Sequence, residues 1–128
     1  MPTFSAVARA LIAAVGMSSH VDVKLCPQAE AEHAASKRQF CHIGHTKIRH
    51  TICYARSADN LGVNWQVGLV LHELGHLALR DVGIEHTEEE ANFIGGAMLS
   101  IPVAFKGPLM LEWSPVPKWL REALHGRR

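Results

Sequence analysis

The spacing of hydrophobic residues predicts three main helices. In residues 5–15, apolar side chains recur every three or four positions, which places them on one helix face. The longest apolar stretch, residues 67–79, belongs to a predicted helix that begins after an Asn64 N-cap and ends at Gly83. A further helix is expected over residues 87–100.

Alternating and β-branched positions predict strands in the first half of the chain. Residues 21–25 alternate between apolar and polar side chains, and residues 47–55 are rich in β-branched ones. Between them, residues 28–38 are expected to form a short helix or a polar loop. An N-terminal helix, two or three strands and then two helices indicate an α+β fold with a short mixed or antiparallel sheet.

The length, charge and hydrophobicity of the chain exclude only a few classes of partner. A chain of 128 residues with 48% hydrophobic side chains has the size and composition of one globular domain. Thirteen basic and twelve acidic residues give a net charge of +1, so no nucleic-acid partner is expected for this domain. No apolar run approaches the length of a membrane-spanning helix, so no membrane partner is expected either.

The number of cysteines indicates the cellular compartment in which the protein is located. The three cysteines, Cys26, Cys41 and Cys53, are an odd and sparse set that does not fit a disulfide scaffold. Reduced thiols in a cytoplasmic protein fit them best. A secretory signal is the alternative reading of the N-terminus, but its uninterrupted apolar part, residues 10–15, is short.

The strongest chemical pattern is His72-Glu73-Leu74-Gly75-His76, inside the apolar stretch 67–79. Histidines four residues apart share one helix face, so both imidazoles can bind one ion. Glu73 lies beside that face, where its carboxylate can reach a water held by the ion. Burying such groups is costly unless they are paired or bind a metal. The pattern therefore predicts His72 and His76 as zinc ligands and Glu73 as the general base of a hydrolase.

A catalytic zinc needs a third protein ligand and an open position for water. The following helix offers Glu88-Glu89-Glu90-Ala91-Asn92. Glu88 and Asn92 share a face with small residues, which allow that helix to approach the zinc helix closely. Glu88 is the predicted third ligand, and Asn92 is expected to hold a ligand histidine by a hydrogen bond.

Other residues compete for the third position. Glu90 is the main alternative, although Thr87 and Glu90 also fit a capping box, which would use the Glu90 carboxylate at the helix start. Glu89 and His86 are further alternatives. The capping box places Glu88 in the first helical turn, where its direction depends on how the helix docks.

These segments resemble the ImmA/IrrE family of zinc metallopeptidases, within the gluzincin group that includes thermolysin. The resemblance is carried by residues 70–77 and by Glu88-Glu89-Glu90-Ala91-Asn92, followed by small residues, Met98-Leu99 and Pro102. The first glutamate of the family pattern is the zinc ligand and maps to Glu88. The resemblance implies one zincin-like metallopeptidase domain over residues 1–128, with its core at 46–102 and a C-terminal tail at 103–128.

The resulting hypothesis is a metallopeptidase with one Zn²⁺ per chain. The family resemblance suggests a specific protein substrate, such as a transcriptional regulator. The strand at 47–55 is expected to lie along the cleft and to pair through its edge with an extended peptide. Tyr54, His50 and His86 are candidates for stabilising the transition state.

Two other functions compete with the peptidase. In the first, zinc is structural and the chain is a regulatory or partner-binding domain without activity. The second, a zinc-dependent ribonuclease, requires a further histidine where the sequence has Val82. Separately, residues 41–45 (CHIGH) with Cys26 suggest a second metal site, but their spacing matches no standard zinc finger and a strand and turn explain them equally well.

Overall fold

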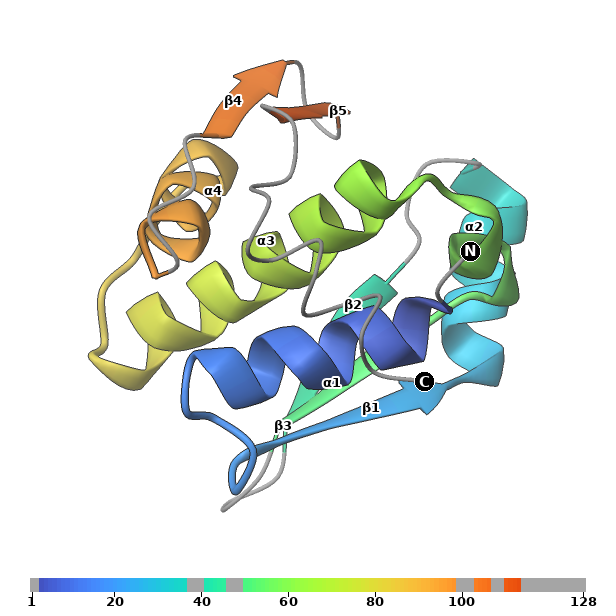
Figure 1. The fold of residues 1–128 in the computed structure, drawn as a ribbon, viewed down its shortest axis with the longest axis horizontal. Helices are drawn as coiled ribbons and strands as arrows, with labels where there is room; N and C mark the ends of the chain where they lie inside the picture. Colours follow the sequence, from blue (N-terminus) through green and yellow to red (C-terminus); the bar gives the residue numbers. More distant parts are fainter. Residues whose placement is uncertain (1–2, 37–40, 46–49, 99–102, 107–109, 114–128) are drawn as a thin grey trace.

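The computed structural model describes residues 3–36, 41–45, 50–98, 103–106 and 110–113 (Figure 1). Helices and strands follow one another along the described chain in the order expected of an α+β fold. They are α1 (Phe4–Ala14), β1 (Val21–Leu25), α2 (Pro27–Ser36), β2 (Cys41–His45), β3 (His50–Tyr54), the 3₁₀ helix η1 (Arg56–Asn60), α3 (Val63–Asp81), α4 (Glu88–Ala97), β4 (Val103–Lys106) and β5 (Met110–Trp113).

The first three strands form one mixed sheet in the order β1-β3-β2. β3 is parallel to β1 and antiparallel to β2, with Ile52 opposite both Val23 and Ile43. The prediction was a short mixed or antiparallel sheet, and the sheet is mixed. The prediction that the edge of β3 is open to a substrate is wrong, because β3 is central and both of its edges are already hydrogen-bonded. The outer edges of this sheet belong to β1 and β2.

The core lies between the sheet and two helices that pack against each other, α1 and α3. Figure 1 shows α1 over β1 and β3, with α3 alongside. Val21, Val23 and Ile52 are buried while their strand neighbours are more exposed, so the sheet buries alternate residues. The helices complete the core with apolar side chains at helical spacing, among them Phe4, Val7, Leu11, Val67, Val70, Leu71, Leu74 and Leu77.

The helix that carries the zinc motif starts earlier than predicted. It begins at Val63 with Gly62 as the N-cap, so the prediction of Asn64 as the cap is wrong. A contact with the preceding 3₁₀ helix helps to place this start: the buried Gln66 side chain donates from Nε2 to the Ala58 carbonyl, 3.2 Å away in η1. At the other end, Gly83 adopts a φ of +73°, the left-handed conformation expected just after a helix.

The predicted cap of the following helix is confirmed. The Thr87 hydroxyl accepts a hydrogen bond from the Glu90 backbone N–H at 3.2 Å. The Glu90 carboxylate accepts one from the Thr87 backbone N–H at 3.1 Å, which completes the capping box. The helix described ends at Ala97, and Ser100, its predicted end, lies outside the described residues.

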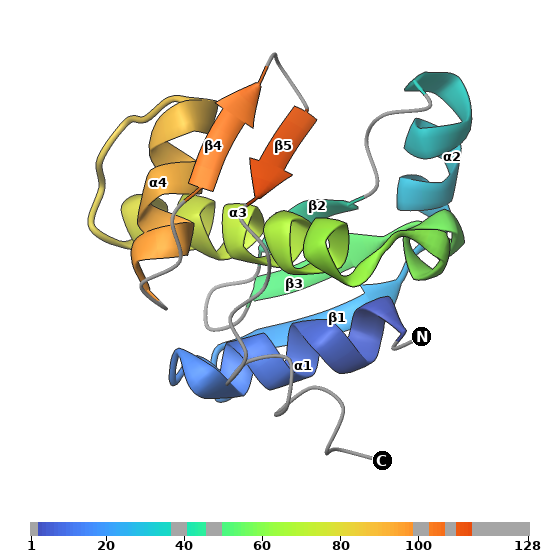
Figure 2. The same ribbon diagram turned by 45° about the horizontal axis from the view of Figure 1, so that its top comes forward.

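The chain beyond α4 contains an element that the sequence pattern did not predict. Strands β4 and β5 pair as an antiparallel hairpin, with Phe105 opposite Leu111. β4 contacts α4 and β5 contacts α3. Figure 2 shows this hairpin on the α3–α4 side of the molecule, away from α1. In the N-terminal half, the segment predicted as a helix or a loop is helical, as α2.

The closest helix contact is between α3 and α4, and it depends on two glycines. A Cβ added at Gly75 would overlap the carbonyl oxygen of Ala91, and one added at Gly95 would overlap the carbonyl oxygen of Leu71. Residues later in α3 therefore face residues earlier in α4, as in an antiparallel pair. No side chain larger than hydrogen fits at either position without moving a backbone.

We expect Gly75→Ala to destabilise the fold, because backbone atoms cannot move aside as a flexible side chain can. Overpacking of this kind typically costs about 1–3 kcal/mol, even though alanine favours the helical backbone. The control is Gly62→Ser, since a Cβ at Gly62 meets nothing within 4 Å. Thermal denaturation should show a lower melting temperature for Gly75→Ala alone. Equal melting temperatures for Gly75→Ala and the parent would contradict the close contact.

Candidate metal centre

The structure brings the three predicted ligands together at the junction of α3 and α4. Nε2 of His72 lies 3.0 Å from Nε2 of His76. Oε2 of Glu88 lies 2.7 Å from the first of these nitrogens and 2.9 Å from the second. Three atoms with lone pairs therefore form a nearly equilateral triangle, contributed by two turns of one helix and the first turn of the next.

This triangle has the chemistry and the size that Zn²⁺ requires. Tetrahedral zinc with bonds of about 2.0–2.1 Å places its ligand atoms roughly 3.3 Å from one another, slightly wider than the triangle. Two imidazoles and one carboxylate form the ligand set of many catalytic zinc sites, which keep a fourth position for water. Among the described residues, His72, His76 and Glu88 are the group of potential ligands whose atoms lie close enough to share an ion.

Exposure shows from which side the cluster is open. The exposed fraction of the side chain rises from 11% for His72 to 26% for His76 and 52% for Glu88. The cluster is therefore shielded at its base on α3 and accessible beside Glu88. Glu73, the predicted general base, lies on α3 directly after the first ligand and is only 9% exposed.

The helix cap separates the roles of the neighbouring glutamates. The Glu90 carboxylate accepts hydrogen bonds from both the backbone N–H and the hydroxyl of Thr87, so it is used at the helix start. Glu88, one turn ahead of the contact between Gly75 and Ala91, points instead at the histidines. Glu89 is exposed and is not part of the cluster.

The electrostatics of the cluster favour the protonation states of a metal site. Burial lowers the pKa of His76 below its usual 6.5, and the nearby charge of His72 lowers it further. Burial alone would raise the pKa of Glu88, but the charges of His76 and His72 and their hydrogen bonds outweigh it, and the net shift is downward from 4.5. Near neutral pH, His76 is therefore a neutral imidazole and Glu88 a carboxylate.

Other predicted site residues lie elsewhere. The Tyr54 ring packs on Phe4, with centroids 5.0 Å apart. His50 is the first residue of β3, and its Nε2 lies 3.4 Å from Oδ1 of Asp81, the last residue of α3. The transition-state roles of Tyr54 and His50 stay predictions. The Asn92 side chain lies outside the described part of the structure.

His86 has a position that the sequence analysis missed. It was a candidate ligand or transition-state group, but its Nε2 lies 2.6 Å from Nδ1 of His76, on the side of that ring away from the cluster. The available signal was the short connection between α3 and α4. A histidine within six residues of the end of α3 has few places to lie other than against its last turns.

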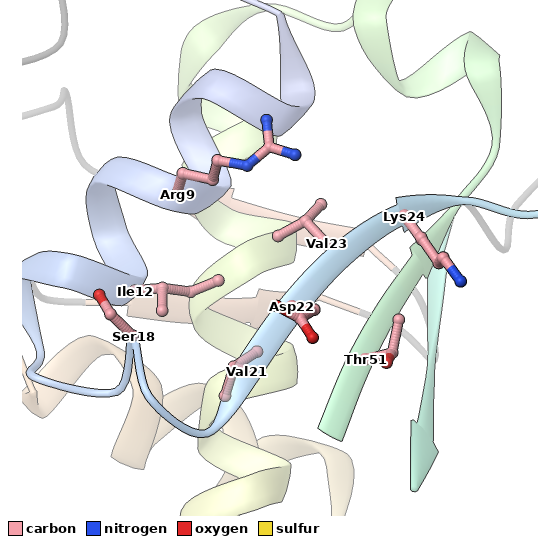
Figure 3. Close-up of a pocket in the computed structure, with 8 residues that line it drawn as sticks. All are labelled: Arg9, Ile12, Ser18, Val21, Asp22, Val23, Lys24 and Thr51. Atoms are coloured by element: carbon pink, nitrogen blue, oxygen red, sulfur yellow. The ribbon is translucent and has the colours of Figure 1, made fainter. Parts of the chain in front are cut away.

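Two further features of the chain, its cysteines and a surface pocket, lie outside the metal cluster. The side chains of residues 41–45, which form β2, lie outside the described ones, and neither Cys26 nor Cys53 forms a disulfide among the described residues. A pocket of about 420 Å³ lies between α1 and the edge strand β1 (Figure 3). Its charged lining residues carry both signs and are exposed, and none belongs to the metal cluster: Arg9, Asp22 and Lys24.

The chain was compared with protein families, with curated proteins and with solved structures, and none of these comparisons found a match. The resemblance of residues 46–102 to a metallopeptidase family therefore stays a prediction. Within the described residues, no helix combines the length and the apolar character needed to cross a membrane.

Two alanine substitutions separate the ligand from the cap. Removing a hydrogen-bond partner of a metal ligand typically costs 10- to 100-fold in affinity, so removing a ligand in Glu88→Ala should weaken zinc binding by more than about 100-fold. Glu90→Ala should leave zinc affinity unchanged and lower the free energy of unfolding by about 0.5–2 kcal/mol. Competition with a chromophoric chelator measures the first effect, and thermal denaturation measures the second. The reverse pattern would identify Glu90 as the ligand.

Proposed function

We propose that this chain is a zinc-dependent metallopeptidase in which His72, His76 and Glu88 hold one Zn²⁺ and Glu73 is the general base. The observation that carries the proposal is the triangle of Nε2, Nε2 and Oε2 atoms, with sides of 3.0, 2.7 and 2.9 Å, built on an HExxH helix. A purely structural zinc site normally uses four protein ligands. Three ligands on an open side of the molecule favour a reactive site.

The zinc ligands and Glu73 would have separate roles in peptide hydrolysis. Zinc bound at this cluster would supply Lewis-acid activation, lowering the pKa of a water towards about 7. Glu73 accepts the proton as the water attacks the scissile carbonyl, and then delivers it to the leaving amine. Glu73 directly follows His72 on α3, and its side chain is buried. The exposed side, beside Glu88, gives the substrate access.

The shape of the sheet supports an extended protein segment as the substrate. β2 is an edge strand and contacts α3, whereas β3 is enclosed between two strands. A peptide pairing with the open edge of β2 would gain backbone hydrogen bonds without depending on its sequence. The family resemblance suggests that the substrate is a specific protein, such as a transcriptional regulator. The odd and sparse set of cysteines favours a cytoplasmic location for the chain.

The test is Glu73→Gln, which removes the base and retains nearly the same volume. General-base catalysis typically contributes 10²- to 10⁴-fold, so the rate of peptide cleavage should fall by about that factor. Zinc content should stay the same, because Glu73 is not a ligand. Mass spectrometry of a diverse peptide library incubated with the zinc-loaded protein measures cleavage at any sequence that the protein accepts.

The matched control is Glu89→Gln, which makes the same chemical change at an exposed carboxylate outside the cluster. The Glu89→Gln variant should cleave peptides at the same rate as the parent. A Glu73→Gln variant that cleaves as fast as the parent would contradict the proposed mechanism. A zinc-loaded parent that cleaves nothing would favour the competing function, a regulatory or partner-binding domain that zinc stabilises.

A further inference from the structure

His86 lies in the connection between α3 and α4 and makes two polar contacts through its ring. Its Nε2 is 2.6 Å from Nδ1 of His76. Its Nδ1 is 3.0 Å from the backbone carbonyl oxygen of Ile84. The ring is partly buried, and its plane is tilted by 45° to that of His76, with centroids 4.9 Å apart.

The carbonyl of Ile84 fixes the direction of these hydrogen bonds. A carbonyl oxygen can only accept, so Nδ1 of His86 must carry the proton in this contact. In a neutral imidazole the other nitrogen is then an acceptor, so Nε2 of His86 accepts from Nδ1 of His76. His76 consequently carries its proton on Nδ1.

That tautomer leaves Nε2 of His76 without a proton. This nitrogen is the one that faces His72 at 3.0 Å and Glu88 at 2.9 Å. The lone pair on this nitrogen repels the Glu88 carboxylate oxygen, and it can accept a hydrogen bond from Nε2 of His72 or bind a cation. The same tautomer is the one in which a neutral histidine binds a metal through Nε2.

We propose that His86 is a positioning residue that holds His76 in its Nδ1–H tautomer and thereby sets the zinc affinity of the cluster. The inference rests on the proposed function, since it requires zinc to be the ion bound. It goes beyond the HExxH pattern, because it assigns to a residue of the connection a role that the pattern does not contain. For His76, it also fills the role that was expected of Asn92.

The experiment compares His86→Ala with His86→Gln in the full chain, using zinc alone as the probe. Glutamine extends an amide to about the reach of Nε2 of histidine, and its carbonyl oxygen can accept from Nδ1 of His76. His86→Ala should weaken zinc binding by about 10- to 100-fold, the usual effect of losing such a partner. His86→Gln should recover most of that loss. The control is His20→Ala, which removes an exposed imidazole far from the cluster in the sequence.

A spectroscopic readout separates positioning from a general effect on folding. In nitrogen-15 NMR spectra of the zinc-loaded parent, His76 should show a proton on Nδ1 that exchanges slowly with water. That signal should be lost to exchange in His86→Ala and kept in His86→Gln. Unchanged zinc affinity in His86→Ala would overturn the proposal, as would equal losses in both variants. A parent that binds no zinc would instead overturn the proposed function.

Discussion

The contact between α3 and α4 at Gly75 and Gly95 is the constraint on which the metal cluster depends. Each glycine faces a backbone carbonyl of the other helix, so the two backbones approach as closely as atoms allow. The pair runs antiparallel. Glu88 lies one turn before Ala91 on α4, and that turn lies opposite the turn of α3 that carries His76. A wider separation would withdraw the Glu88 carboxylate from both histidines, because the length of a glutamate side chain is fixed. The two glycines at this helix contact therefore set the size of the triangle of ligand atoms.

The connection between these helices combines several tasks in six residues. Gly83 ends α3 with a left-handed residue, Thr87 caps α4, and His86 lies between them against His76. A longer connection would leave both the direction of α4 and the position of His86 less defined.

The protonation state of His76 also favours a bound cation. The pKa of His76 is lowered, chiefly by burial, so the crowding of lone pairs around Glu88 is not relieved by protonating that ring near neutral pH. A divalent cation relieves it and satisfies all three atoms at once.

The parts of this site that the sequence predicted are those with a local signature. The spacing of His72 and His76 and the capping box of Thr87 and Glu90 need only the geometry of one helix, and the structure has both. The start of α3 was misplaced because a buried glutamine bonded to η1 helps to fix it, and the central place of β3 depends on pairing with strands distant in sequence. The β4–β5 hairpin has no strong alternating pattern and was missed. His86 was missed because its role comes from the direction of a hydrogen bond, which sequence spacing does not contain.

Zinc stoichiometry tests the central claim most directly. The untagged protein would be stripped with a chelator, supplied with excess zinc, separated from free metal, and measured by elemental mass spectrometry alongside a variant with both His72 and His76 changed to alanine. The account predicts about one zinc per chain in the parent and none in the variant. A folded parent that retains no zinc, or a double variant that retains as much as the parent, would contradict it.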